Sequence, residues 1–132
     1  MALDCQVEIH TILLAEDDPH IRRVSEIALR RDGFAVMAVS DGTEVLQLLE
    51  DRLFDLVVLD GMMPNMDGLE SCRRIKADPR MRHIPVVMLS ARTQASDEAA
   101  SQAAGALGYI RKPFDALLLG SELRRLCAGT RS

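Results

Sequence analysis

The chain has 132 residues, enough for one folded domain with a hydrophobic core but not for a second one. Hydrophobic residues make up 48% of it and aromatic residues only 3%, so we expect an aliphatic core. A net charge of −4 and dispersed basic residues argue against direct binding of nucleic acid. No apolar run is long enough to span a bilayer, and the first residues lack the pattern of a signal peptide, which predicts a cytoplasmic protein without membrane contact.

The first half of the chain alternates apolar runs with helical patterns. Residues 11–15 predict a buried strand, after which Asp18 and Pro19 predict the N-cap and first turn of a helix. A second strand over residues 35–39 and a second helix from about residue 42 repeat this unit. The face of the first helix that we expect to be buried carries Ile21, Val24 and Ala28.

The second half continues the alternation. Residues 56–59 are apolar and rich in β-branched side chains, which predicts a strand buried on both faces and ending at Asp60. After a loop in which Asp67 orders the turn or caps the next helix, residues 85–90 predict a fourth strand. The alanine-rich helix over residues 95–104 is expected to be the least firmly packed and mobile.

The last predicted elements are a short fifth strand at residues 109–110 and a helix that buries Leu119, Leu123 and Leu126. Gly120 lies within this helix, where a glycine costs roughly 1 kcal/mol relative to alanine. About five strands alternating with about five helices predict an α/β fold, a doubly wound five-stranded parallel sheet with helices on both faces.

Polar side chains follow four of the predicted strands at the points where the strands end. They are Glu16 and Asp17 after the first, Asp60 at the third, Ser90 at the fourth and Lys112 just after the fifth. Because the carboxyl ends of parallel strands meet at one edge of a sheet, we expect these groups to lie together. Carboxylates about 4 Å apart repel by roughly 4 kcal/mol per pair at an effective dielectric near 20, so the cluster requires a cation or protons.

The chemistry of this predicted cluster favours phosphoryl transfer. Oxygen ligands without a His or Cys grouping favour Mg²⁺ or Mn²⁺ over zinc. A metal, a lysine and a hydroxyl around one carboxylate neutralise the charge of a transferring phosphoryl group. Asp60 is the predicted nucleophile, which would form an acyl phosphate, although an isolated aspartate at such a place would more often cap a helix or order a turn.

Five short motifs occur in a fixed order along the chain. They are Glu16-Asp17, Asp60 with Met63-Pro64 and Asp67-Gly68, Ser90-Ala91, Gly108-Tyr109, and Lys112-Pro113-Phe114. From Ile9 to about Cys127 the chain therefore resembles the receiver domains of two-component response regulators, the CheY-like family. We expect residues 9–128 to form this domain, with residues 1–8 as a short leader and residues 129–132 as a tail.

The resemblance implies a flavodoxin-like sheet of strand order 2-1-3-4-5 and a phospho-acceptor in a two-component or phosphorelay system. Asp60 would take a phosphoryl group from a sensor histidine kinase or a histidine phosphotransfer protein. Mg²⁺, or Mn²⁺, would be held by Asp17 and Asp60, by Glu16 through a water molecule, and by the backbone carbonyl of Met62. The output would be a downstream effector protein or an output domain outside this chain.

The family's switch residues also have counterparts here. The resemblance implies that Ser90 and Lys112 hold phosphoryl oxygens and that the Lys112-Pro113 peptide bond is cis. Tyr109 would turn inward as Ser90 moves toward the phosphate, although a packing role for the ring stays equally open. The Met62 and Met63 side chains are expected to pack within their loop.

Two other functions remain open on the sequence. A phosphatase of the haloacid dehalogenase type also uses an aspartate nucleophile and Mg²⁺, but it requires a second aspartate two residues later, where this chain has Met62. A receiver-fold scaffold without phosphorylation is disfavoured by the complete set of acids and Lys112. We therefore expect a signalling phospho-acceptor rather than an enzyme. The segment before Tyr109 lacks the acid pair typical of OmpR-like transcription factors, which weakens the expectation of their dimer interface.

Overall fold

Strands and helices alternate along the whole described part of the chain. The computed structural model describes residues 9–91 and 95–128, so the predicted leader and tail lie outside the described residues. The strands within these ranges are β1 (Thr11–Ala15), β2 (Ala35–Val39), β3 (Leu56–Asp60), β4 (Val86–Ser90) and β5 (Gly108–Arg111). The helices are α1 (Pro19–Arg31), α2 (Gly42–Asp51), α3 (Gly68–Ala77), α4 (Ala95–Ala103) and α5 (Ala116–Ala128).

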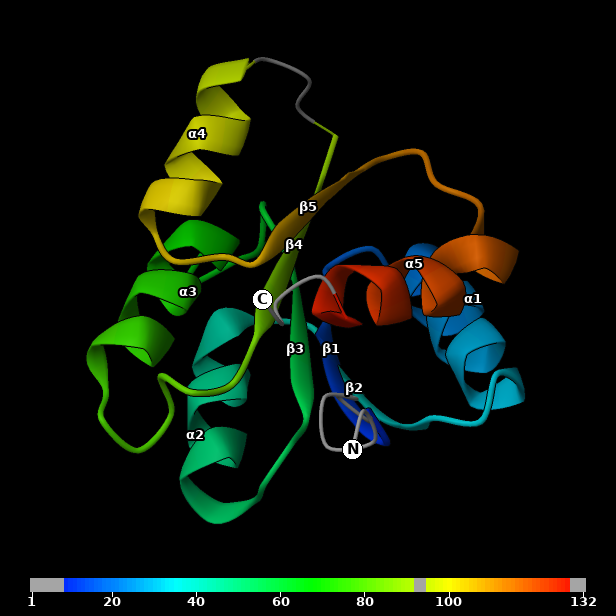
Figure 1. The fold of residues 1–132 in the computed structure, drawn as a ribbon, viewed down its shortest axis with the longest axis horizontal. Coiled ribbons are helices and arrows are strands. Elements are labelled where there is room, and N and C mark those ends of the chain that lie inside the picture. The colour runs from blue at the N-terminus through cyan, green and yellow to red at the C-terminus, as the bar shows by residue number, and fades with distance from the viewer. Residues whose placement is uncertain (1–8, 92–94, 129–132) are drawn as a thin grey trace, which may run out of the picture.

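The strands form one parallel sheet of order β2-β1-β3-β4-β5, as the resemblance implied. Figure 1 shows α1 and α5 on one side of the sheet and α2, α3 and α4 on the other. The chain order reverses at β1, since β2 lies on one side of it and β3 on the other. The carboxyl ends of the strands next to such a reversal form the crevice in which doubly wound sheets bind ligands.

The three central strands are buried on both faces. In β1, Ile12 and Leu14 belong to the core beneath α1 and α5, whereas Leu13 and Ala15 belong to the core beneath α2 and α3. The same alternation holds along β3 and β4, because successive side chains of a strand point to opposite faces. This two-sided burial is why these strands read as continuous apolar runs in the sequence.

Aspartates cap four of the helices that follow strands, namely Asp18, Asp41, Asp67 and Asp115. The Asp18 carboxylate accepts hydrogen bonds from the backbone N–H groups of His20 and Ile21, at 2.8 and 3.2 Å. Asp67 accepts one from Glu70 N–H at 2.9 Å. The predictions for Asp18 and Asp67 are therefore confirmed, and the loops that follow β1 and β3 each end at a capped helix start.

One prediction about a helix face needs correction. Val24 was expected in the core but is 40% exposed, whereas Ser25, Ala28 and Leu29 are buried. The buried stripe of α1 is thus shifted by one residue, and two of its three members are small, which allows close packing against α5. Gly120 in α5 is more than a weak helix residue, because a Cβ there would overlap the carboxylate of Asp32 at the end of α1.

No helix within the described residues is both long and apolar enough to cross a membrane.

Candidate phosphoryl-transfer site

The carboxyl edge of the sheet brings Glu16, Asp60 and Lys112 into contact. The Lys112 Nζ lies 2.7 Å from Glu16 Oε1 and 3.2 Å from Asp60 Oδ1. The Glu16 side chain is fully buried, and the side chains of Asp60 and Lys112 are only 8% and 13% exposed. One ammonium group therefore balances two nearly buried carboxylates, and a negative charge remains in excess.

The backbone around Glu16 and Asp60 fixes both carboxylates. Glu16 Oε2 accepts a hydrogen bond from Asp18 N–H at 3.1 Å, and Asp60 Oδ1 accepts one from Met62 N–H at 3.3 Å. Gly68 packs against the backbone of Asp60, where a Cβ would overlap the Asp60 carbonyl oxygen. Each carboxylate is thus held by its own strand end and by the loop that follows it.

The pKa values of Glu16 and Lys112 both depart from their ordinary values, because charged groups meet in a buried place. Burial, with the nearby Asp60 carboxylate acting in the same direction, raises the pKa of Glu16 to about 7 in spite of Lys112. Burial alone would lower the pKa of Lys112, but its contacts with the carboxylates of Glu16 and Asp60 outweigh that effect and raise it. Lys112 therefore stays charged, and Glu16 is protonated in part near neutral pH because one ammonium group does not neutralise both carboxylates.

Asp17 lies apart from the buried pair, on an open hollow. The hollow has a volume of about 480 Å³ and is lined by Asp17, Gly61, Met62, Met63, Pro64 and Asp67. Within the described ranges no three Asp, Glu, His or Cys side chains converge as metal ligands. The oxygen donors nevertheless suit a hard divalent cation, because Asp17 and the loop of Met62 line one hollow together with Gly61, the residue that follows Asp60. Met62 is 61% exposed, so the expectation that its side chain packs within the loop is wrong, whereas Met63 packs against the core as expected.

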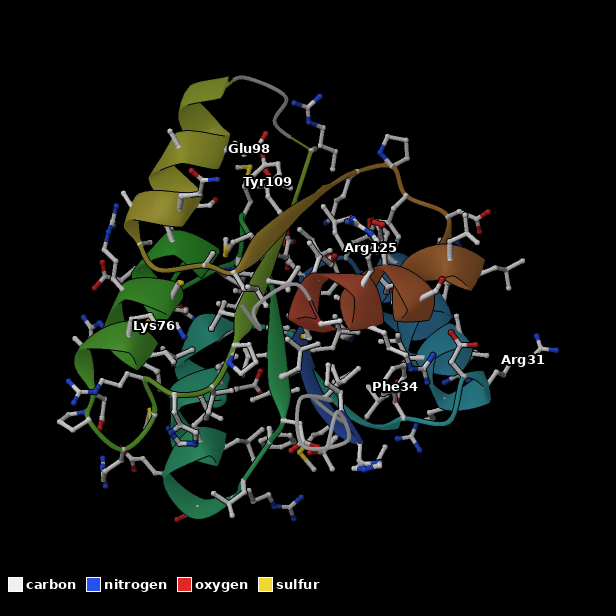
Figure 2. All side chains as sticks on the ribbon, in the orientation of Figure 1. Arg31, Phe34, Lys76, Glu98, Tyr109 and Arg125 are labelled. Carbon is white, nitrogen blue, oxygen red and sulfur yellow. The ribbon has the colours of Figure 1, made fainter. Side chains whose placement is uncertain are left out.

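Ser90 and Tyr109 line the same small cavity near the end of β3. Ser90, Gly61 and Tyr109 are among the residues that line a cavity of about 50 Å³. The Ser90 carbonyl accepts a hydrogen bond from the Lys112 N–H at 2.8 Å, which ties the end of β4 to the segment carrying Lys112. The Lys112-Pro113 peptide bond is cis, as expected. Tyr109 and Glu98 also line a second pocket between α4 and β5 (Figure 2).

Arg22 is a contributor to the site that the sequence reasoning missed. Its guanidinium donates hydrogen bonds to the backbone carbonyls of Glu16 and Asp17, at 2.9 and 3.4 Å. It lies in the first turn of α1, where a cation opposes the helix dipole. That unfavourable placement was the one signal in the sequence that could have indicated a positional role.

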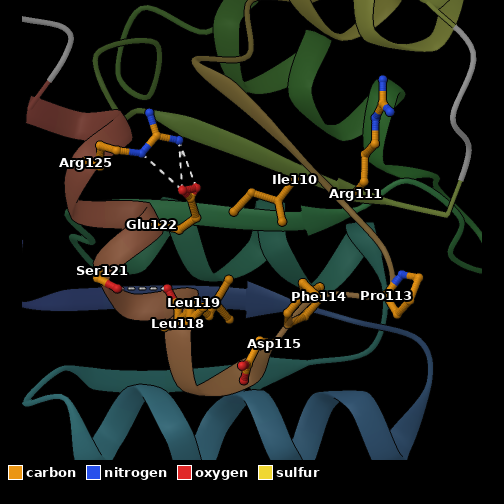
Figure 3. Close-up of a pocket in the computed structure, with 10 residues that line it drawn as sticks. All are labelled: Ile110, Arg111, Pro113, Phe114, Asp115, Leu118, Leu119, Ser121, Glu122 and Arg125. Carbon is orange, nitrogen blue, oxygen red and sulfur yellow. Dashed lines mark hydrogen bonds and ion pairs between the residues drawn. The ribbon is translucent and has the colours of Figure 1, made fainter.

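A further hollow of about 480 Å³ lies between the end of β5 and α5 (Figure 3). Ile110, Phe114 and Leu118 supply its apolar wall, and Arg125 closes it through an ion pair with Glu122 at 2.8 Å. None of the predicted site residues lines it. It is a surface feature separate from the acidic cluster.

The matches to known proteins agree with this geometry. Residues 12–124 match the family model of the response regulator receiver domain. The chain belongs to this family. Among curated relatives, the receiver domain is 42% identical over 113 residues to the transcriptional regulatory protein CseB of Streptomyces avermitilis, covering 86% of the chain and 47% of the relative. It is 38% identical over 103 residues to the DNA-binding response regulator MtrA of Mycolicibacterium smegmatis, covering 78% and 44%.

Solved structures also resemble the receiver domain. The receiver domain of a signal transduction histidine kinase from Syntrophus aciditrophicus superposes with a TM-score of 0.82 at 33% identity, covering 92% of both chains. The chemotaxis response regulator CheY4 of Vibrio cholerae gives 0.84 at 28% identity, covering 90% of this chain and 99% of its own. The present chain spans about half the length of the curated relatives it matches. It is a receiver domain of the two-component type, the class of signalling domain that accepts phosphoryl groups.

Proposed function

We propose that this receiver domain takes a phosphoryl group onto Asp60 from a phosphohistidine of a sensor histidine kinase or a histidine phosphotransfer protein. An Asp60 carboxylate oxygen attacks phosphorus, the bond between phosphorus and the imidazole nitrogen breaks, and an acyl phosphate and free histidine result. The observation that carries the proposal is the contact of Lys112 Nζ with both Asp60 and Glu16, at 3.2 and 2.7 Å. This contact supports the proposal because a positive charge beside Asp60 would stabilise the phosphoryl oxygens during transfer.

The acids beside Asp60 would hold Mg²⁺ or Mn²⁺. Asp17 and Asp60 would bind it directly, Glu16 through water, and Met62 through its backbone carbonyl. The metal, when bound, supplies the positive charge that lets an anionic carboxylate meet an anionic phosphoryl group. The excess negative charge of the buried cluster and the hollow between Asp17 and Met62 support this assignment.

Ser90 and Lys112 would bind phosphoryl oxygens after transfer, and Tyr109 would respond. A phosphoryl group adds about 1.5 to 2 negative charges. It would stabilise the conformation in which the Ser90 hydroxyl and the Lys112 ammonium lie closer to it. Because Ser90 and Tyr109 line one small cavity, a displacement of Ser90 changes the space that the Tyr109 ring can occupy. The change would reach a partner through α4 and β5.

The partners follow from this role. The receiver domain would receive its phosphoryl group in the cytoplasm and act through an effector protein or an output domain outside this chain, without touching nucleic acid or membrane itself. Two curated relatives are named as a transcriptional regulatory protein and a DNA-binding response regulator, and both are about twice as long as the match. The additional length of these relatives supports an output domain outside the matched segment.

Phosphorylation with a small donor tests the proposal. We expect acetyl phosphate and Mg²⁺ to give wild type a labile, phosphate-sized mass increase, and Asp60→Asn to give none. An unchanged wild-type mass would contradict the proposal and favour a scaffold. Rapid multiple turnover of unrelated phosphate esters would instead indicate a phosphatase, so the domain would then be an enzyme.

A further inference from the structure

The loop that carries Met62 contains a tight turn at Asn65. Asn65 has a φ of 67°, in the left-handed region, and Met66 N–H donates a hydrogen bond to Pro64 O at 2.7 Å across it. Asparagine tolerates this backbone better than most residues, but a side chain still makes it costly unless the surroundings hold it. A hydrogen bond of the Asn65 side chain holds this backbone conformation in place.

The Asn65 side chain is bonded to the start of α2. Its Nδ2 donates a 2.7 Å hydrogen bond to Oδ2 of Asp41. The other oxygen of the same carboxylate caps α2, accepting hydrogen bonds from Thr43 N–H and Oγ1–H, both at 2.6 Å. One aspartate therefore fixes a helix start and a loop 24 residues away.

The backbone packing beneath this bond is equally close. A Cβ on Gly42, the first residue of α2, would overlap the Met66 carbonyl oxygen and the Ser71 hydroxyl. Only glycine lets α2 approach the loop and α3 at this distance. The contact between Asp41 and Asn65 is thus a hydrogen bond placed over a tight backbone contact, and we refer to this pair as the latch.

We propose that the latch between Asp41 and Asn65 positions the Met62 carbonyl and thereby sets the affinity of the receiver domain for Mg²⁺. The loop is anchored at its ends, where Gly68 N–H donates to Gly61 O at 3.2 Å, so the latch restrains its middle. Asn65 is three residues from Met62, and the hydrogen bonds of the latch join Asp41 to Asn65 and to the first turn of α2. The latch would act by positioning the Met62 carbonyl. This inference rests on the proposed role of Met62 as a metal ligand.

The test compares three variants by isothermal titration calorimetry of Mg²⁺ into metal-free protein. Asn65→Gly keeps a backbone free to adopt the left-handed region and removes the amide. We expect its Mg²⁺ dissociation constant to rise about fivefold, the effect of losing one hydrogen bond of typical net strength. The exchange Asp41→Asn/Asn65→Asp rebuilds the bond with donor and acceptor reversed, and should restore wild-type affinity. Thr43→Val weakens the cap but leaves the latch, so it should lower the melting temperature and leave Mg²⁺ affinity unchanged.

A second readout separates positioning from general damage. The Mg²⁺ concentration that gives half-maximal phosphorylation by acetyl phosphate should rise in Asn65→Gly, while the rate at saturating Mg²⁺ should stay near wild type. Equal Mg²⁺ affinities in wild type and Asn65→Gly, or no rescue by the exchanged pair, would overturn the latch while leaving the proposed function intact. A wild-type protein that binds no Mg²⁺ would overturn both.

Discussion

Two aspartates bracket β3, and their surroundings are opposite. Asp55, just before the strand, accepts hydrogen bonds from the backbone N–H groups of His10 and Thr11 at 2.8 and 3.1 Å. Asp60, at its end, shares the Lys112 ammonium with Glu16. Backbone donors cannot move to another partner without unfolding β1, whereas an ammonium can shift between carboxylates and phosphate oxygens. The same residue type therefore joins two strands at one end of β3, and at the other end it is the proposed phospho-acceptor.

The largest expected effect comes from removing the shared cation. Lys112→Met leaves two nearly buried carboxylates without their counter-charge, which should lower the free energy of unfolding by about 3 kcal/mol. It should also slow phosphorylation by acetyl phosphate about 100-fold, because the charge facing the phosphoryl oxygens is gone. Urea denaturation and mass spectrometry would measure the two effects. Arg125→Met, which breaks an exposed ion pair with Glu122, is the control and should change neither appreciably. Normal phosphorylation of Lys112→Met would show that the cation is not part of the reaction.

At the other end of β3, the effect should fall on stability alone. Asp55→Ala removes the acceptor for His10 N–H and Thr11 N–H, and should lower the free energy of unfolding by about 2 kcal/mol. Phosphorylation of Asp60 should proceed at the wild-type rate, since the Lys112 contacts stay intact. A large loss of phosphorylation in a folded Asp55→Ala protein would mean that the two ends of the strand are coupled, and the contrast between them would fail.

The contrast also shows what the sequence could predict. The strands and helix caps follow from apolar periodicity and turn residues, the strand order follows from the family resemblance, and the meeting of Asp60 and Lys112 follows from the strand ends at which they lie. The burial of Glu16 beside an exposed Asp17 does not, because adjacent acids look alike until the path of the chain after β1 is known. Val24 was misplaced for a related reason, since the packing of α1 against α5 selects the small residues Ser25 and Ala28 rather than the most hydrophobic stripe.

Acid should weaken the structural end of β3 in a predictable direction. Partial burial alone would raise the pKa of Asp55, but hydrogen bonds from His10 and Thr11 outweigh it and hold the pKa below its ordinary value of 3.8. The carboxylate therefore adds stability that is present above pH 3.8 and is lost as the pH falls through the lower folded-state pKa. Urea denaturation between pH 5 and about pH 2 should show a shallower loss in Asp55→Asn than in wild type. Parallel curves would contradict this account of Asp55.

The smallest effect should come from the partner of Asp55 across the sheet. Asp55 N–H lies 3.0 Å from both the hydroxyl and the carbonyl oxygen of Thr11. Thr11→Val removes the hydroxyl and keeps the carbonyl, so the N–H retains an acceptor and no donor is left unpaired. We expect a loss of about 0.5 kcal/mol in the free energy of unfolding, at the low end for a single hydrogen bond. In a double-mutant cycle, the loss of unfolding free energy in Thr11→Val/Asp55→Ala should differ from the sum of the two single losses, because both changes act on one hydrogen-bonded junction. Strict additivity would mean that the two groups hold β1 to β3 independently, and that Asp55 is secured by its backbone donors alone.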